Sequence, residues 1–182
     1  MSAGPELRTE RLLLRRWRTS DLEPCAAMNA DPRVMENFPA ALSRRESDAF
    51  IERMEACFED CGYGLWALEL PGEASFIGCV GLLAVGNELP FAPAVEVGWR
   101  LAPAHWGTGL AAEAASAAIA FAFDRLRLRE LVAYTAERNV RSRRLMDRLG
   151  MSHDPAEDFA HPGLPVGHPL APHVLYRLGS SP

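Results

Sequence analysis

The sequence predicts an α+β fold in which helices flank a single mixed central sheet. Three apolar runs separated by turn signals read as successive antiparallel strands, at Leu65–Leu70, Phe76–Leu83 and Val95–Leu101. After them come a glycine loop, a long alanine-rich helix expected from Gly109 to about Phe123, and an apolar strand at Leu131–Thr135. Such a strand–helix–strand crossover favours a parallel pair. The chain of 182 residues is expected to form one domain, residues 1–182.

The first part of the chain predicts a strand and two helices. The strand is expected over Leu12–Trp17. The first helix is expected to open at a capping box of Ser20 with Glu23 and to end near Ala30, before Asp31-Pro32. A second capping box, Ser43 with Glu46, opens the other helix, and Gly62 and Gly64 close it. One face of that helix carries its apolar residues, Phe50, Met54, Cys57, Phe58 and Cys61.

The last part predicts a short helix, a loop and a final strand. The helix is expected over Asn139–Leu149, with Gly150 at its C′ position. The segment Asp154–Pro172 is rich in Pro, Gly and His and is expected to be loop. His173–Leu178 reads as the last strand.

The composition of the chain excludes some classes of function. The net charge of −5 argues against general nucleic-acid binding. No apolar run is long enough to span a membrane, and Met1–Glu6 lacks a signal-peptide pattern, so a cytoplasmic protein is expected. All 19 basic residues are arginine, which together with abundant alanine is typical of a GC-rich bacterial genome. The four cysteines lack zinc-site spacing; we interpret them as apolar core residues and predict no metal site.

One stretch is locally basic within this acidic total. It allows two interpretations, a solvated helix face with its loop or a seat for a phosphorylated small ligand. Its members are Arg125, Arg127, Arg129, Arg138, Arg141, Arg143, Arg144 and Arg148.

The segment that carries chemistry is Trp106-Gly107-Thr108-Gly109, which leads directly into the alanine-rich helix. Glycines let the backbone approach a ligand, and the first N–H groups of a helix attract anions. The loop therefore suits a pyrophosphate. A dinucleotide-binding GxGxxG motif fails because its third glycine would be Ala112, and a Walker motif fails because the chain has no lysine.

With its surroundings, this segment resembles the GNAT superfamily of acyltransferases, and in particular the branch of the ribosomal-protein N-terminal acetyltransferases that act on alanine or serine. The matching parts span about residues 7 to 151 and occur in order: Leu7–Arg15 with Asp21, Glu96–Leu101, His105–Ala114, and Asn139–Ser142 with Leu145 and Leu149–Met151. The family often has Gln or Arg at the position of Ala104, so this chain departs from the pattern there.

The resemblance implies that acetyl-CoA is the co-substrate and lies between two splayed strands, with no metal involved. Pantetheine would pair with the backbone of the strand before the loop, pyrophosphate would bind the loop, and Asn139 would bond the pantetheine arm. The expected cofactor-binding residues are Trp99, Arg100, Leu101, Trp106, Gly107, Thr108, Gly109, Leu110, Ala111, Asn139 and Ser142.

The resemblance also implies direct attack of an amine on the thioester, for which two residues are candidates for proton transfer. Glu96, on the strand that faces the cofactor, is the candidate base; it could equally be a surface or ion-paired strand residue. Many relatives place a tyrosine acid where this chain has Met146. Either another residue is the acid, with Ser142 as the first candidate, or water protonates the thiolate; serine in a first helical turn also often serves the helix itself.

Other residues could border the acceptor. His153, His161, His168 and His173 lie in or beside the tail loop, where a substrate contact competes with a role as ordinary loop residues. Phe38, Trp66 and Trp99 could line a pocket or belong to the core.

We therefore predict acetyl transfer from acetyl-CoA to a primary amine. A protein N-terminus and a small amine, such as a polyamine, an amino sugar or an amino acid, both remain open as acceptors. The alternative is an acyl-CoA-binding module or sensor without catalysis. The sequence predicts neither a nucleic acid nor a membrane as partner and does not fix the oligomeric state; a homodimer is one candidate.

Overall fold

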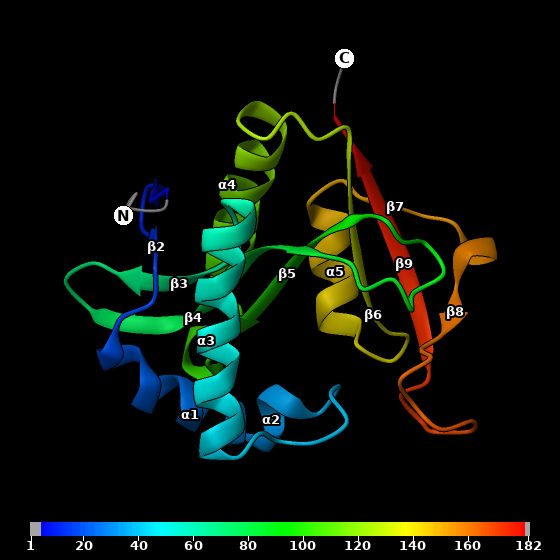
Figure 1. The fold of residues 1–182 in the computed structure, drawn as a ribbon, viewed down its shortest axis with the longest axis horizontal. Helices are drawn as coiled ribbons and strands as arrows, with labels where there is room; N and C mark the ends of the chain where they lie inside the picture. The colour runs from blue at the N-terminus through cyan, green and yellow to red at the C-terminus, as the bar shows by residue number, and fades with distance from the viewer. Residues whose placement is uncertain (1–4, 181–182) are drawn as a thin grey trace.

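The computed structural model describes residues 5–180, which form one mixed sheet with helices on both faces (Figure 1). The strand order is β1-β2-β3-β4-β5-β6-β9-β7, with β8 paired to β9. The strands are β1 (Leu7–Arg8), β2 (Leu13–Arg15), β3 (Leu65–Leu70), β4 (Ala74–Ala84), β5 (Val95–Leu101), β6 (Glu130–Ala136), β7 (Ser152–His153), β8 (Phe159–Ala160) and β9 (Pro172–Gly179). The helices are α1 (Leu22–Ala30), α2 (Pro32–Met35), α3 (Arg44–Cys61), α4 (Leu110–Asp124) and α5 (Val140–Arg148).

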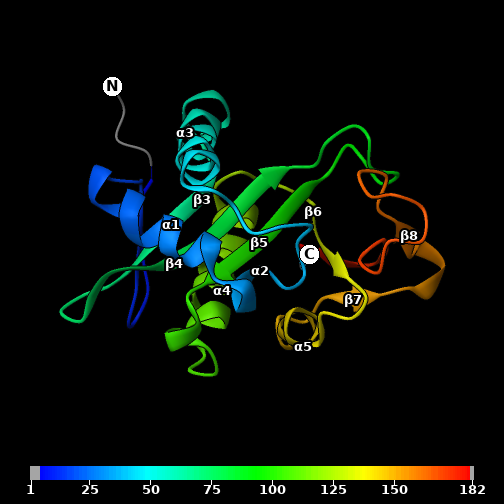
Figure 2. The ribbon, with the colours of Figure 1, turned by 90° about the horizontal axis from the view of Figure 1, so that it is seen from below.

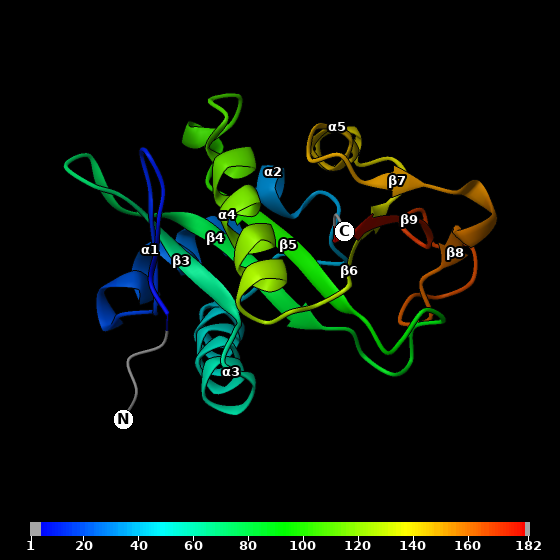
Figure 3. The same ribbon diagram turned by 90° about the horizontal axis from the view of Figure 1, so that it is seen from above.

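The predicted α+β fold with a mixed sheet is confirmed. Strands β2 to β5 pair antiparallel in sequence order, and β5 and β6 are parallel across the α4 crossover. Seen from below and from above, α4 and α5 lie on one side of the sheet and α3 lies on the other (Figure 2 and Figure 3). The alanines of α4 allow close packing on the sheet, and Ala114, Ala115 and Ala118 are fully buried.

The first thirty residues differ from the prediction. The strand expected over Leu12–Trp17 is shorter than predicted, since only β2, Leu13–Arg15, falls in this range, and a further short strand, β1, precedes it and pairs with it. The capping box of Ser20 with Glu23 is wrong. A 3-10 turn, Thr19–Asp21, precedes α1, the Asp21 carboxylate accepts from the Arg18 backbone N–H, and Glu23 instead pairs with Arg44.

The longest helix agrees better with the sequence. Ser43 and Glu46 form the predicted capping box of α3, and Gly62 ends the helix with a φ of 76°. Phe50, Met54 and Phe58 are buried on its inner face, as expected. The interpretation of all four cysteines as core residues is wrong for Cys61, which is exposed because α3 ends there at the surface, and holds fully only for Cys25 and Cys79.

The end of the chain also carries more structure than predicted. The tail expected to be loop contains a 3-10 turn, Pro155–Glu157, and strand β8, whereas β9 and Gly150 with a φ of 77° follow the prediction. Within residues 5–180, no helix is long and apolar enough to cross a membrane. Met1–Gly4, on which the signal-peptide argument partly rests, lie outside the described residues.

A buried ion pair joins β2 to the start of α1. The Arg15 guanidinium donates to both Asp21 carboxylate oxygens, at 2.7 and 2.9 Å, and to Glu69 at 2.7 Å. It also donates to the carbonyls of Arg16 and Ser75. Because these contacts satisfy a guanidinium that is only 1% exposed, the pair fixes the sheet edge to the first helix.

Asp21→Ala is expected to lower the free energy of unfolding by about 3–5 kcal/mol, because it leaves the Arg15 charge buried without its main partner. Denaturant unfolding followed by circular dichroism measures this change. Asp48→Ala, which removes the exposed Arg44–Asp48 pair, is the control and should cost less than about 1 kcal/mol. Equal losses in the two variants would contradict a structural role for the buried pair.

Candidate functional site

The site lies where the sheet opens between β5 and β6. The two parallel strands share a single paired position, Glu96 with Val132, whereas the other edge of β5 pairs with β4 along its whole length. Beyond Glu96, the two strands diverge. The β5 edge from Gly98 to Leu101 is therefore left without a neighbouring strand on that side, and a ligand can use its backbone groups.

A cavity of about 690 Å³ occupies this opening, which is the size of a small-molecule site. Its lining comes from two sets of elements. We call the first set the groove; it comprises Trp99, Leu101, Trp106, Gly107, Gly109, Ala111, Asn139, Ser142, Arg144 and Arg148 from β5, the glycine loop, α4 and α5. We call the second set the chamber; it comprises Val34, Phe38, Phe50, Leu65, Leu83, Glu96, Gly98, Arg100, Tyr134, Leu164 and Leu170.

The glycine loop has the backbone conformation that the sequence predicts. Gly107 and Gly109 have φ values of 74° and 82°, in the left-handed region that favours glycine. Gly109 caps α4 without a side-chain hydrogen bond, so no side chain covers the first N–H groups of the helix. The Trp106 indole donates to the Leu101 carbonyl at 2.8 Å and fixes the loop against β5. The loop thus presents free N–H groups and a helix dipole to the groove.

The connection between β1 and β2 braces this loop. Glu113, in the first turn of α4, accepts hydrogen bonds from the Thr9 hydroxyl at 2.5 Å and from the Arg11 backbone at 2.8 Å. The Arg11 guanidinium donates to Glu113 at 2.7 Å and to the Thr108 carbonyl at 3.0 Å. Partial burial opposes ionisation, yet these hydrogen bonds lower the pKa of Glu113. Two motifs about a hundred residues apart therefore form one support.

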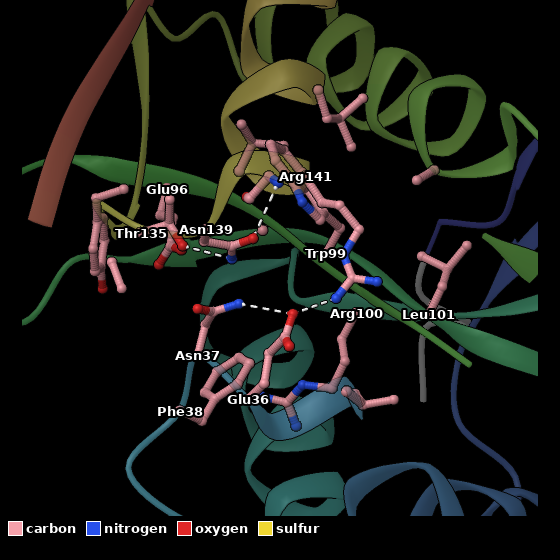
Figure 4. Close-up of a pocket in the computed structure, with 18 of the residues that line it drawn as sticks. Glu36, Asn37, Phe38, Glu96, Trp99, Arg100, Leu101, Thr135, Asn139 and Arg141 are labelled. Carbon is pink, nitrogen blue, oxygen red and sulfur yellow. Dashed lines mark hydrogen bonds and ion pairs between the residues drawn. The ribbon is translucent and has the colours of Figure 1, made fainter. Parts of the chain in front are cut away.

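Asn139 lies at the start of α5 (Figure 4), and Ser142 follows it in the first turn of that helix. The Asn139 amide oxygen accepts from the Ser142 backbone N–H at 3.2 Å, and its amide nitrogen donates to the Thr135 hydroxyl at 2.9 Å. Asn139 is thus the N-cap of α5 and a bridge to β6, with its side chain held in place at the groove. The Ser142 side chain lines the same groove.

Glu96 is half-buried and lines the chamber together with Tyr134. Burial raises the pKa of Glu96 to about 7, although a hydrogen bond from the Tyr134 hydroxyl favours the carboxylate and partly offsets the rise. Burial also raises the pKa of Tyr134, to which the neighbouring Glu96 charge contributes. At neutral pH the phenol is therefore protonated, and the Glu96 carboxyl is poised to take up or release a proton.

Three members of the basic stretch line the cavity from one face of α5: Arg141, Arg144 and Arg148. The Arg141 guanidinium stacks 4.0 Å over the Trp106 ring and pairs with Glu36, which follows α2 (Figure 4). Arg138 donates to the Glu36 carbonyl at 2.5 Å, so two arginines hold the segment after α2 against α5. By contrast, Arg125, Arg127 and Arg129 lie at the turn between α4 and β6, outside this lining.

Several predicted residues lie outside the cavity lining. Trp66 is fully buried in the core, so the hypothesis that it lines a pocket is wrong. Leu110 is buried, and the exposed Thr108 points its hydroxyl at the His105 carbonyl at 2.8 Å, so their predicted cofactor contacts would fall to backbone groups. Met146 is 1% exposed and belongs to the core as well.

The four histidines in or beside the tail loop divide into two that line the cavity and two that do not. His161 and His173 line the cavity with their ring centres 4.9 Å apart, and burial lowers the pKa of His173. His153 pairs with Asp158 at 2.8 Å, and the His168 Nδ1 accepts from the Leu170 backbone at 3.1 Å. Within residues 5–180, no group of three or more His, Cys, Asp or Glu side chains could hold a metal ion.

Sequence reasoning missed Tyr134, Glu36 and the orientation of Arg100. Tyr134 lies on β6 two residues after Val132, which pairs with Glu96, and this register comes from the structure. Arg100 was predicted among the cofactor residues, but its side chain turns to α1 and donates to Asn29 at 2.7 Å. Its predicted contact with the cofactor would therefore rest on its backbone alone.

Comparisons with known proteins agree with this geometry. A family model described as an acetyltransferase (GNAT) domain matches residues 11–152. The FsC-acetyl coenzyme A-N(2)-transacetylase of Aspergillus fumigatus is 30% identical over 162 residues, which cover 84% of this chain and 67% of that protein. The uncharacterized N-acetyltransferase YoaA of Bacillus subtilis is 27% identical over 80% of this chain and 82% of its own length.

Solved structures share the fold over nearly the whole chain. An acetyltransferase from Agrobacterium tumefaciens superposes with a TM-score of 0.79 and 29% identity, covering 99% of this chain and 97% of that one. The ribosomal L7/L12 α-N-protein acetyltransferase RimL, solved in complex with coenzyme A, superposes with a TM-score of 0.76 at 14% identity, over 96% and 98% of the two chains. At that identity, the second likeness concerns the fold alone.

Glu96→Gln should stabilise the protein more at pH 8 than at pH 5. A carboxyl whose pKa rises to about 7 on folding disfavours the folded state once the pH exceeds its unfolded pKa of 4.5, and glutamine lacks this cost. The gain in unfolding free energy between the two pH values should be about 2 kcal/mol, less than the full shift implies because Glu96 keeps some solvent contact. Denaturant unfolding at both pH values measures it. Glu52→Gln, on the exposed side of α3, is the control; a pH-independent difference for Glu96→Gln would contradict the shifted pKa.

Proposed function

Because the chain belongs to the GNAT acetyltransferase family, we propose that it transfers the acetyl group of acetyl-CoA to a primary amine, which is either the α-amine of a protein N-terminus or a small-molecule amine. One observation carries the proposal. The opening between β5 and β6 brings the glycine loop, Asn139 and Glu96 to a single cavity. This arrangement supports both a binding site for the acetyl donor and a proton acceptor for the amine.

The groove suits coenzyme A in its charge and backbone geometry. The uncapped N–H groups at the start of α4 and the arginines of α5 would hold the phosphates. The open edge of β5 would pair with the amide groups of pantetheine, and Asn139 has a second amide hydrogen for that arm. When bound, the co-substrate supplies an activated acetyl thioester, and these residues orient it toward the chamber.

Glu96 is the proposed base, because only a neutral amine attacks a thioester. An α-amine has a pKa of about 8 and a lysine-type amine about 10.4, so the α-amine requires less help at neutral pH. With its pKa raised to about 7, the Glu96 carboxylate accepts a proton near physiological pH, directly or through one water molecule. The neighbouring Tyr134 hydroxyl favours the charged form of that carboxyl and so lowers its pKa, against the larger effect of burial.

Ser142 and Tyr134 are the proposed candidates for donating a proton to the departing thiolate. Met146 is buried in the core and has no acidic proton. Ser142 lies in the groove beside Asn139, and Tyr134 lies in the chamber and is protonated at neutral pH. Ser142→Ala and Tyr134→Phe distinguish the two, because the acid's variant should lower kcat about 10²-fold or more while leaving the affinity for coenzyme A unchanged.

A second candidate function is an acyl-CoA-binding module without catalysis, which the methionine at position 146 favours. Mixing the protein with acetyl-CoA and a panel of amines, and measuring free thiol, separates the two candidates. Thiol release above hydrolysis with at least one amine supports the enzyme. Stabilisation by acetyl-CoA without such release supports the binding module, and absence of any stabilisation contradicts both.

Gly107→Glu should abolish coenzyme A binding without unfolding the protein. The substitution places a carboxylate where the pyrophosphate is proposed to bind, and isothermal titration calorimetry measures the affinity. Gly72→Glu is a matched control. Gly72 also has a positive φ, 84°, and open space around its Cβ, but it lies in the turn between β3 and β4, away from the cavity. Both variants should lose about 1–2 kcal/mol of stability, and only Gly107→Glu should lose binding. Unchanged affinity in Gly107→Glu would refute the loop assignment.

Acetyl transfer should increase with pH through a midpoint near 7, because the base works only as a carboxylate. The profile of kcat/KM against pH gives this midpoint. Glu96→Gln should lower kcat by about 10²–10⁴-fold and remove the midpoint. Tyr134→Phe removes a hydrogen bond that favours the charged form, so its midpoint should move upward. A midpoint that persists in Glu96→Gln would assign the base to another group.

A further inference from the structure

One face of β5 carries two opposite charges with a gap between them. Alternation along the strand places Glu96, Gly98 and Arg100 on the same face, and all three line the chamber. Gly98 has no side chain, and a Cβ there would meet nothing closer than Glu96 Oε1 at 3.4 Å. The floor between the carboxylate and the guanidinium is therefore open, over about 13 Å between the two Cα atoms.

Arg100 lies between two aromatic rings. Its guanidinium carbon is 4.4 Å from the centre of the Phe38 ring and 5.3 Å from that of Phe50. Nη1 donates to the Asn29 amide oxygen at 2.7 Å. Nε is buried and has no hydrogen-bond partner among the described residues. With Nη1 bonded to Asn29, the donors left without a partner among the described residues are those of Nε and Nη2, which share one edge of the guanidinium.

The partners of Arg15, a buried arginine with a purely structural role, provide a comparison for Arg100. Arg15 makes five hydrogen bonds, and two carboxylates balance its charge. Arg100 has one side-chain hydrogen bond to a neutral amide, and within residues 5–180 it has no ion pair. An unpaired buried donor and a cation without a counter-ion both cost free energy. That cost is offset if an anion from outside the chain completes the site.

We propose that Arg100 binds a carboxylate of the acceptor, so that the acceptor is an amino-carboxylate with its amine at Glu96. This inference rests on the proposed acetyl transfer and names the acceptor class. The Nε–Nη2 edge offers two parallel donors, which match the two oxygens of a carboxylate. Phe38, which is 38% exposed in the segment after α2, lines the cavity beside this guanidinium.

The lining of the chamber suits the linker that joins the amine of such an acceptor to its carboxylate. Leu65, Leu83, Leu164 and Leu170 surround the space near the two charges and suit an apolar linker between amine and carboxylate. The separation of Glu96 and Arg100 along β5 favours a linker of several bonds. A free amino acid with a separated carboxylate, or a short peptide, satisfies both charges, whereas a protein N-terminus does so only where a side chain supplies the carboxylate.

The test uses a series of linear ω-amino carboxylic acids of increasing length, each with its matched amide. Free thiol release at saturating acetyl-CoA gives kcat/KM for every compound with wild-type protein, Arg100→Met, Arg100→Lys and Arg53→Met. Arg53 is the matched control, because its guanidinium also lies over Phe50, 6.0 Å from the ring centre, but on the exposed side of α3 outside the cavity.

Wild type should prefer the acid over its amide by about 10- to 100-fold at the best length, with the difference mainly in KM. Arg100→Met should lose this preference while still acetylating amides, and Arg53→Met should keep it. Arg100→Lys should retain only part of the preference, because an ammonium cannot form the two-point contact. This variant decides the outcome if Arg100→Met does not fold. Equal rates for acid and amide at every length, or an unchanged preference in a folded Arg100 variant, would overturn the proposal.

Failure of the proposed function gives a different result. If no amine in the panel is acetylated, the proposed acetyl transfer fails for this class of acceptor. The carboxylate site is then tested separately, by measuring whether the acids bind. With coenzyme A present, the acids should raise the melting temperature of wild type more than that of Arg100→Met, and the amides should not discriminate between the two. An equal shift in both proteins overturns the site.

Discussion

The single paired position between β5 and β6 is the constraint on which the site depends. A parallel pair that continued along Trp99 to Leu101 would close the sheet and leave no cavity. Because the strands share only Glu96 and Val132, the sheet opens as a wedge, and α4 and α5 lie beside it. The chain thereby forgoes hydrogen bonds along one edge of its most central strand. In the folded protein, an extended ligand with its own amide groups is the natural partner for that edge.

The opening is useful only if the loop beside it keeps its shape. Two glycines with positive φ give that loop few contacts of its own, so the rest of the molecule has to support it. The support comes from the first residues of the fold. Thr9 and Arg11 hold Glu113 in the first turn of α4, and Arg11 also holds the Thr108 carbonyl. This explains in physical terms why the sequence pattern at the start of the chain accompanies the glycine loop. The two segments form one structure.

The glycine loop and the elements beside it were predictable from sequence, and most contacts of the chamber were not. A glycine pair before a helix is a local pattern, and local patterns also placed the α3 capping box, the Asn139 cap and β5 itself. The chamber instead combines α2, α3, β5, β6 and the tail, so its contacts depend on tertiary packing. The Glu36–Arg141 pair, for example, joins residues 105 positions apart. The errors at Glu23 and Cys61 have the same origin, because the pairing of Glu23 with Arg44 and the exposure of Cys61 both depend on how the helices pack.

Glu96 occupies the point where the strands part, and its chemistry follows from that place. Its backbone belongs to the single paired position of β5 and β6, and the residue lines the cavity that the divergence creates. Burial at the base of the wedge raises the pKa of Glu96, and Tyr134 of β6 partly offsets this rise by favouring the carboxylate. A carboxylate further along β5 would face the open groove and lose the tyrosine. The same geometric feature therefore opens the sheet for a ligand and adjusts the nearest acid to neutral pH.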